Sequence, residues 1–379
     1  RHCQRTGIGG GGALSCGPMR RAWCVLFIPV VAAVLAALLG ALFKVVERSD
    51  IEVFAAFMHS WKCQKQSYNC FQEILGFFLI FRTSHGYARY AEASQLLHEL
   101  QGSFFDGCSS IMAFVRMSKA DSREVGEFKR WMATLFSLLH AVTLESLETG
   151  SDGTTIAVKE LHVLGAESLS EEHVAIITSS KHKVALLFHW IEIALIQSIN
   201  SGLLNAPPPM VSNAFLKLSK GMLKYENCMK LIFIRFPAPY TFAAAVFLVF
   251  HWILTPFHLC SLCQQPWMVA LYTFITVFAF WSMFKLSQHM EHPFGTDDMA
   301  LDTSAYQHKL NVGLLVLLSP HGSHRPRLLP EHARKSTLPV LGSLATVLQA
   351  SPELGGDWQA LHPRQKDVRT PLLLGALAE

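Results

Sequence analysis

The sequence predicts an all-α membrane protein with four transmembrane helices and a helical bundle on the cytosolic side. The first reason is composition, because the 379-residue chain is 51% hydrophobic and only 16% charged. Its mean hydropathy of +0.29 is also higher than that of ordinary soluble proteins. The second reason is that several uncharged segments are long enough to cross a bilayer core of ~30 Å.

The first predicted span covers residues 22–43, AWCVLFIPVVAAVLAALLGALF, which carry no charge. Arg20 and Arg21 precede it, and Lys44 follows it. This apolar run is longer than the apolar core of a signal peptide, which has about 7–15 residues, so we expect a helix that remains in the membrane. Residues 1–21, which include GIGGGG, are expected to be disordered.

Two more spans are predicted to form a helical hairpin. No Asp, Glu, Lys or Arg occurs between Phe236 and Phe284, and this length is enough for two crossings. The polar, Pro-containing sequence CQQP at 263–266 marks a turn between them. We therefore expect spans at residues 240–259 and 267–284.

The fourth predicted span, residues 66–84, is the least apolar. Ser67, Asn69 and Glu73 precede its aromatic run LGFFLIF, and Arg82 follows that run. Polar residues at membrane depth are tolerated where a helix is buried in protein or lines a water-filled cavity. This segment is therefore predicted to line a pore, and an interfacial helix is the alternative.

Residues 85–235 are predicted to form cytosolic helices. Segments 127–142 and 184–199 carry apolar residues at i, i+3 and i+4, which is typical of helices that pack into a bundle. For segment 184–199, a fifth span interrupted by Glu192 is an alternative. The basic residues that flank the spans place both termini and this bundle in the cytosol under the positive-inside rule.

Two functional classes are not favoured by the residue pattern. The net charge of +4 is modest, and no Lys/Arg cluster is interleaved with aromatic residues, so nucleic acid is not expected as a partner. His289 and His292 could place two imidazoles on one helix face for a metal. No second His pair accompanies them, and we do not predict an enzyme.

Three segments occur in a distinctive order: LGFFLIFRTSHGYARYAEA at 75–93, RFPAPYTF at 235–242 and MEHPFGTDD at 290–298. They resemble motifs of the bestrophin and bestrophin-like (voltage-dependent chloride channel-like) anion-channel family. Those motifs read roughly L-x-F-x-x-F-R-T-N-x-S-Y-x-R-F-x-E-x-R, P-x-P-[FY] and E-[DN]-P-F-G-x-[DE]-D. The resemblance covers about residues 22–310, expected to be the channel domain, and leaves a tail at 311–379 expected to be disordered.

The resemblance implies a homo-oligomer, a pentamer, that surrounds one axial pore in membrane lipid and conducts inorganic anions such as chloride or bicarbonate. Side chains that face the axis recur at every fourth residue of the second membrane helix. The implied neck residues are Asn69, Glu73 and Phe77, with Phe81 one turn further along. Five Phe77 rings would form a hydrophobic aromatic neck that gates by dewetting and presents positive ring edges to an anion.

Glu73 and Asn69 depart from the family, whose neck is usually apolar. Five ionised glutamates would repel chloride and favour cations. Three interpretations stay open: a shifted register in which Ile74, Phe78 and Phe81 face the pore, a neutral or paired Glu73, or a changed selectivity. A non-conducting or cation-altered bestrophin-like membrane scaffold is the alternative function.

Arg82 and Arg89 lie seven residues apart, near one face of a helix, and Glu92 follows three residues after Arg89. One interpretation is an electropositive vestibule that attracts anions to the cytosolic mouth of the pore. The other is a set of inter-helix ion pairs, and the two are compatible.

The resemblance also places Asp297, Asp298 and Asp302 at the acidic cluster that helps to hold Ca²⁺ in calcium-gated animal members, where oxygen ligands suit this hard cation. The run TDDMALD is less acidic than in those proteins. The alternative is a turn that caps the last helix. Ca²⁺ is the one cofactor that the resemblance suggests.

The sequence leaves open whether the protein lies in the plasma membrane or in an organelle membrane, including that of chloroplasts.

Overall fold

The structure is a computed structural model that describes residues 18–49, 65–149, 161–234, 236–294, 300–320 and 322. These residues belong to one compact unit of the chain. Within these ranges every regular element is a helix, as the composition and periodicity predicted. The predicted disorder of residues 1–17, and of the tail after residue 322, concerns positions outside the described residues.

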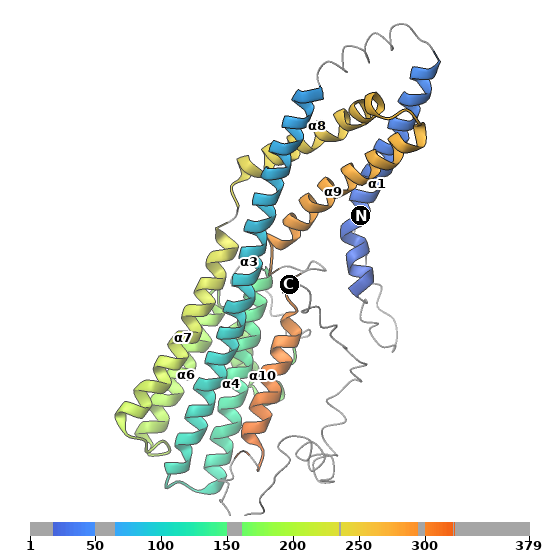
Figure 1. Cartoon of the computed structure of the whole chain (residues 1–379). Helices are drawn as coiled ribbons and strands as arrows, with labels where there is room; N and C mark the ends of the chain where they lie inside the picture. Colours follow the sequence, from blue (N-terminus) through green and yellow to red (C-terminus); the bar gives the residue numbers. More distant parts are fainter. Residues whose placement is uncertain are drawn as a thin grey trace, which may run out of the picture. The chain divides into compact units, whose positions relative to one another are not determined.

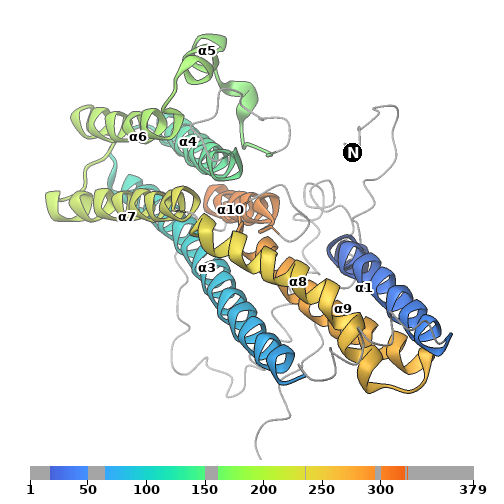
Figure 2. The same ribbon diagram turned by 90° about the horizontal axis from the view of Figure 1, so that it is seen from above.

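Three described helices are long and apolar enough to cross a membrane, judged by length and composition: α1 (Pro18–Arg48), α8 (Ala238–Leu262) and α9 (Pro266–Met290). Helix α1 packs along α9, and α8 packs against both (Figure 1 and Figure 2). The predicted hairpin is confirmed, because only three residues separate α8 from α9. Residues 18–21, expected to be disordered, are the first turn of α1 instead.

Helix α3 (Lys65–Phe114) contains the fourth predicted span but continues far beyond residue 84. It is a single helix of 50 residues, which corresponds to ~75 Å. It is not one of the three helices apolar enough to qualify as a membrane span. Its first half packs against α8 and α9, whereas its second half packs against α7 (Pro208–Phe233) and other helices of a second bundle.

The second bundle combines the C-terminal half of α3 and α7 with α4 (Ser122–Thr149), α6 (Lys183–Asn200) and α10 (Thr303–Leu318). The short helix α5 (Glu171–Ser179) packs on α6. The predicted helical segments 127–142 and 184–199 lie inside α4 and α6. Because α6 packs against α4 and is not one of the candidate spans, the fifth-span alternative loses its support.

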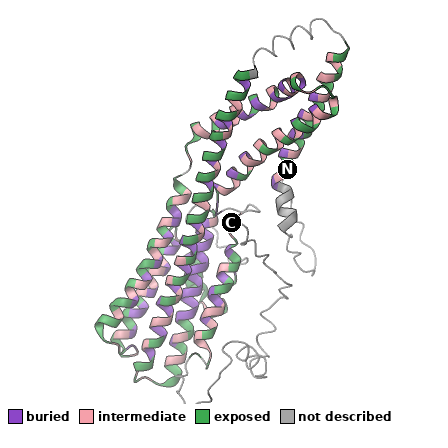
Figure 3. Ribbon diagram, viewed as in Figure 1, coloured by how far each residue is buried: buried purple, intermediate pink, exposed green. Residues whose placement is uncertain are grey.

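The predicted domain boundary at residue 310 falls inside α10 and needs correction. Helix α10 continues to Leu318, and both Leu310 and Leu314 are buried in the core of the second bundle. Residues 311–318 are therefore not part of a disordered tail, because apolar side chains on one face of α10 anchor it against α4 and α3. Figure 3 shows how strongly burial is concentrated in this bundle.

Candidate pore-lining helix and its junction with the second bundle

One face of the N-terminal half of α3, which packs on the hairpin, is left uncovered by the described residues. Phe77 is 73% exposed, and Asn69 and Glu73 are also exposed, at a spacing of four residues that places all three on one side of the helix. Phe81, one turn further along, is 53% exposed. The structure thus brings the four residues predicted for the neck onto an uncovered surface of the subunit, here called the α3 open face.

The opposite face of α3 is packed against the helical hairpin. Its buried residues form one apolar cluster with α8 and α9, made of Leu75, Leu79, Ala244, Leu248 and Phe284. Because this cluster involves two neighbouring helices, it fixes the rotation of α3 about its own axis.

Phe78 also belongs to the packed side of α3. Its ring stacks on Tyr240 with centroids 3.9 Å apart, and the Tyr240 hydroxyl donates a hydrogen bond of 2.9 Å to the Phe78 carbonyl oxygen. The alternative register placed Ile74, Phe78 and Phe81 toward a pore. Ile74 and Phe81 do lie uncovered, but Phe78 packs inside the subunit.

The side chain of Glu73 makes no hydrogen bond or ion pair with any other residue in the described ranges. Its carboxyl group therefore has no cationic neighbour there to offset its charge. A paired Glu73 would need a partner from elsewhere in the chain or from another copy. Within the described subunit, the exposed carboxylate and the Phe77 ring share one helix face, one turn apart.

Arg82 is fully buried and forms an ion pair with Glu291 at the end of α9. Its Nε and Nη2 atoms donate to the two carboxylate oxygens at 2.8 and 3.2 Å, and its guanidinium carbon lies 4.5 Å from the centroid of the Phe284 ring. Such a bidentate pair is strong and geometrically specific. Of the two interpretations of Arg82, the structure therefore supports the inter-helix ion pair. This pair joins the motif at 75–93 to the motif at 290–298.

Arg89 caps the C-terminal end of α7. Its Nη1 donates to the Ile234 carbonyl at 2.7 Å and its Nη2 to the Leu231 carbonyl at 2.5 Å. The last carbonyls of a helix lack partners inside the helix and favour a cation, so this position suits an arginine. Glu92 is exposed, and no ion pair joins it to another described residue.

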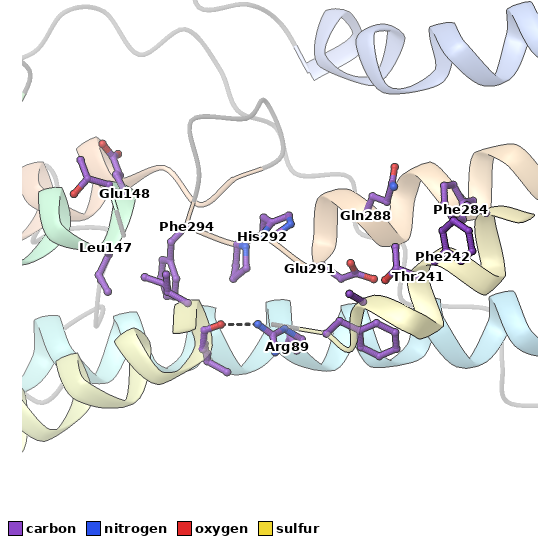
Figure 4. A pocket seen from close by; sticks show the side chains of 17 residues that line it. Arg89, Leu147, Glu148, Thr241, Phe242, Phe284, Gln288, Glu291, His292 and Phe294 are labelled. Carbon is purple, nitrogen blue, oxygen red and sulfur yellow. Dashed lines mark hydrogen bonds between the residues drawn. The ribbon is translucent and has the colours of Figure 1, made fainter. Parts of the chain in front are cut away.

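A cavity of about 840 Å³ lies where α3, α7, α8 and α9 meet the end of α4 (Figure 4). Arg89 lies on one wall, and Glu291 and His292 approach from the segment that ends α9. Glu148, at the end of α4, closes another side and accepts a hydrogen bond from the Thr303 hydroxyl. We call this space the junction cavity.

The acidic segment after α9 is described only in part. The side chain of Asp302 caps α10, because its Oδ1 accepts from the Ala305 backbone N–H at 3.2 Å and from the Ser304 hydroxyl at 2.6 Å. Asp297 and Asp298 lie outside the described residues. In the described part of the chain, no three His, Cys, Asp or Glu side chains gather as metal ligands, so the calcium site stays a prediction.

Sequence reasoning did not single out Glu291 or Tyr240 as site residues. Glu291 neutralises Arg82, and Tyr240 bonds to the backbone of α3. Each stands inside one of the recognised motifs, at the end of an apolar helix where a polar group requires a partner. The presence of a polar residue at the end of an apolar helix therefore indicates that it has a partner, but the sequence does not identify that partner.

An all-helical membrane protein, with a long helix that passes from an apolar hairpin into a second bundle, is the class that this fold and site define. Residues 19–313 match the family model described as bacterial/fungal bestrophin protein. Because this match covers well over half of the sequence, the chain belongs to the bestrophin family.

Solved structures with the same fold come from bacterial relatives. A bacterial bestrophin homologue from Klebsiella pneumoniae is 18% identical, with a TM-score of 0.60, and the match covers 77% of this chain and 99% of that one. A mutant form of a bestrophin homologue from the same organism gives 18% identity, a TM-score of 0.60, and coverage of 75% and 98%. At this identity the likeness shows the fold. No protein with a curated description matches the chain.

Proposed function

We propose that this protein is an ion channel assembled from several copies, with the α3 open face lining the pore. The bestrophin family supports anion conduction at the level of the family. The observation that carries the proposal is the uncovered Phe77, which shares its helix face with Asn69 and Glu73. A helix face of this polar and aromatic composition suits a water-filled axis better than lipid tails.

The proposed assembly is a pentamer with four crossings in each subunit, made by α1, the first half of α3, α8 and α9. The termini and the second bundle would then lie in the cytosol. Five Phe77 side chains would form the narrowest ring and gate conduction by excluding water. Chloride and bicarbonate are the proposed permeant ions, because the positive edges of aromatic rings can face an anion without binding it tightly.

Cation conduction is the second candidate, and Glu73 favours it. Its carboxylate lies on the α3 open face without a partner among the described residues. Five such groups around one axis would create a negative potential that attracts potassium or sodium and excludes chloride. A scaffold without conduction is the remaining alternative.

The test is single-channel recording from the purified full chain in planar bilayers under a potassium chloride gradient. A reversal potential near the chloride equilibrium value supports the anion channel, a value near that of potassium supports the cation channel, and silent bilayers favour the scaffold. Glu73→Leu should raise the chloride-to-potassium permeability ratio at least about tenfold, which is the effect of ~1.4 kcal/mol of electrostatic energy. The matched control is Glu124→Leu, at an exposed glutamate of α4, which should leave the ratio unchanged.

A further inference from the structure

The turn between α8 and α9 carries two cysteines, in the sequence CSLC, that the proposed pore does not use. Cys260 lies in the last turn of α8, and Cys263 directly follows this helix. Cys260 is fully buried, Cys263 is half-buried, and both thiols are reduced. The turn lies beside the C-terminal end of α1 (Figure 1 and Figure 2). C-x-x-C spacing is typical of thiol pairs that undergo thiol–disulfide exchange, so this turn is a candidate redox site.

The two cysteines lie one helical turn apart. The Cys263 backbone N–H donates to the Leu259 carbonyl at 2.9 Å, which continues the bond pattern of α8. Residues three apart in a helix have Cβ atoms roughly 5–6 Å from one another. A disulfide needs a Cβ separation of about 3.5–4.5 Å, so the two residues must approach by only ~1–2 Å. Both also pack in one small apolar cluster with Val269.

Cys263 is placed to make this movement. Its φ of −96° and ψ of 142° are extended and not helical, and only Gln264 and Gln265 separate it from α9. Both glutamines are exposed, so a small reagent in water can reach the Cys263 thiol. A disulfide that forms with such a shift is strained, and strained disulfides are easily reduced. The pair therefore suits reversible oxidation better than a permanent cross-link.

A carboxylate of α1 contacts the buried thiol. Cys260 Sγ donates to Glu47 Oε2 over 3.5 Å. Lys44 Nζ donates to the same carboxylate oxygen at 2.6 Å and to the Cys260 carbonyl at 3.1 Å. Arg48 Nη2 donates to the Gln264 carbonyl at 3.0 Å. The end of α1 therefore holds the turn in place and presents a proton acceptor to Cys260.

We propose that Cys260 and Cys263 form a redox-active pair that a low-molecular-weight disulfide oxidises to an intramolecular disulfide. The Cys263 thiolate attacks one sulfur of that disulfide, displaces a thiolate and forms a mixed disulfide. Cys260 then gives its proton to Glu47, and its sulfur attacks the Cys263 sulfur and displaces a second thiolate. Each displaced thiolate takes up one of the two protons that the cysteines release. Two protein thiols are thus oxidised, and the added disulfide is reduced to two thiols.

Oxidation also changes the contact between α1 and the hairpin, because it removes the hydrogen bond from Cys260 to Glu47. The topology proposed for the channel puts this turn on the side of the membrane away from the cytosol, where disulfides persist. The compartment therefore rests on the proposed function, whereas the chemistry of the pair does not. Since the experiment uses protein in detergent and records no current, failure of the pair and failure of conduction are distinguishable.

The test is incubation of the purified full chain with glutathione disulfide, followed by alkylation, proteolysis and mass spectrometry. The wild-type peptide that contains both cysteines should become lighter by two hydrogen atoms, and dithiothreitol should restore its reduced form. Cys260→Ser should stop at a glutathione adduct on Cys263, because the thiol that displaces glutathione is absent. Cys108 is an internal control in the second bundle. Burial raises its pKa, and it should remain unmodified.

A second variant tests the proton acceptor. Glu47→Gln keeps the size of the side chain but cannot take up the proton, so it should slow closure of the mixed disulfide at least about tenfold. Glu124→Gln, at an exposed glutamate of α4, is the matched control and should close at the wild-type rate. Glutathione adducts on both cysteines of the wild type, or thiols that stay reduced, would overturn the redox pair. An unchanged rate in Glu47→Gln would overturn the role of Glu47.

Discussion

The two halves of α3 pass through regions that are stabilised in different ways. In the second bundle, buried side chains such as Phe104, Met132 and Phe136 form one large cluster. Around α1, α8 and α9, buried residues form only three small clusters, and large side chains such as Phe27 and Leu38 are 65% and 63% exposed. Water drives apolar burial in the first region, whereas lipid offers no such drive in the second.

Polar groups follow the same division. In the second bundle, His140 bonds Gln307 at 2.6 Å, and Gln307 and Asn311 both donate to the His162 carbonyl. In the hairpin, both ring nitrogens of His251 are buried without a hydrogen-bond partner among the described residues. The His251 ring stacks on Phe280 instead. In the described residues, the second bundle thus holds a connected side-chain network, whereas the hairpin has isolated bonds, such as Tyr68 to Thr255 at 2.8 Å and Trp252 Nε1 to the Ala32 carbonyl at 2.9 Å.

The largest expected effect is loss of the buried ion pair at the junction. Arg82→Met leaves Glu291 buried and unpaired, and should lower the free energy of unfolding by about 3–5 kcal/mol. Arg123→Met, which removes the exposed pair with Glu127, should cost about 0–1 kcal/mol. Thermal unfolding in detergent measures both. If Arg82→Met/Glu291→Leu is no more stable than Arg82→Met, the pair does not explain the loss.

Acid should weaken the second bundle through His140. Burial lowers the pKa of His140 to about 4, whereas the unfolded chain has the ordinary value of 6.5. Between these pH values the unfolded state binds more protons, so stability falls as pH falls, by ~3 kcal/mol near pH 4. His140→Gln should remove this part of the pH dependence, and the exposed-site control His98→Gln should keep it. If the free energy of unfolding falls equally with pH in the wild type and in His140→Gln, then His140 is not the cause of the acid sensitivity.

The contact between α3 and α7 should be sensitive to one methyl group. Gly221 of α7 lies so close to the buried Phe104 ring that a Cβ atom there would overlap the ring. Gly221→Ala should therefore cost about 1–3 kcal/mol. Gly102→Ala, where no atom lies within 4 Å of the new methyl group, should stabilise α3 by about 0.5–1 kcal/mol. Urea unfolding of the two variants should shift in opposite directions.

The smallest expected effect concerns the hydrogen bond that holds α3 to the hairpin. Tyr240→Phe keeps the stacking on Phe78 and removes only the hydroxyl, so it should cost about 0.5–1.5 kcal/mol. Tyr87→Phe, at a tyrosine that is 64% exposed, should be neutral. Equal midpoints of thermal unfolding for the two variants would mean that this bond contributes nothing.

Much of the hairpin was predictable from residues close together in the sequence. The uncharged length between Phe236 and Phe284, with a polar turn in its middle, defines two helices because a membrane tolerates few other structures. The helices at 127–142 and 184–199 follow from their periodicity for the same local reason. The end of α10 was missed, because the predicted boundary followed the extent of the family resemblance, whereas the helix continues to Leu318.

For the candidate site, the sequence determined some features and the tertiary structure determined others. The chain sequence was enough to place Asn69, Glu73 and Phe77 on one side of a helix, because the α-helical repeat depends only on spacing. Only the tertiary structure decided that this side is uncovered. It also decided that Arg82 pairs with Glu291, 209 residues away, and does not face solvent. Burial and charge pairing depend on neighbours that are distant in the sequence, and local patterns carry no record of them.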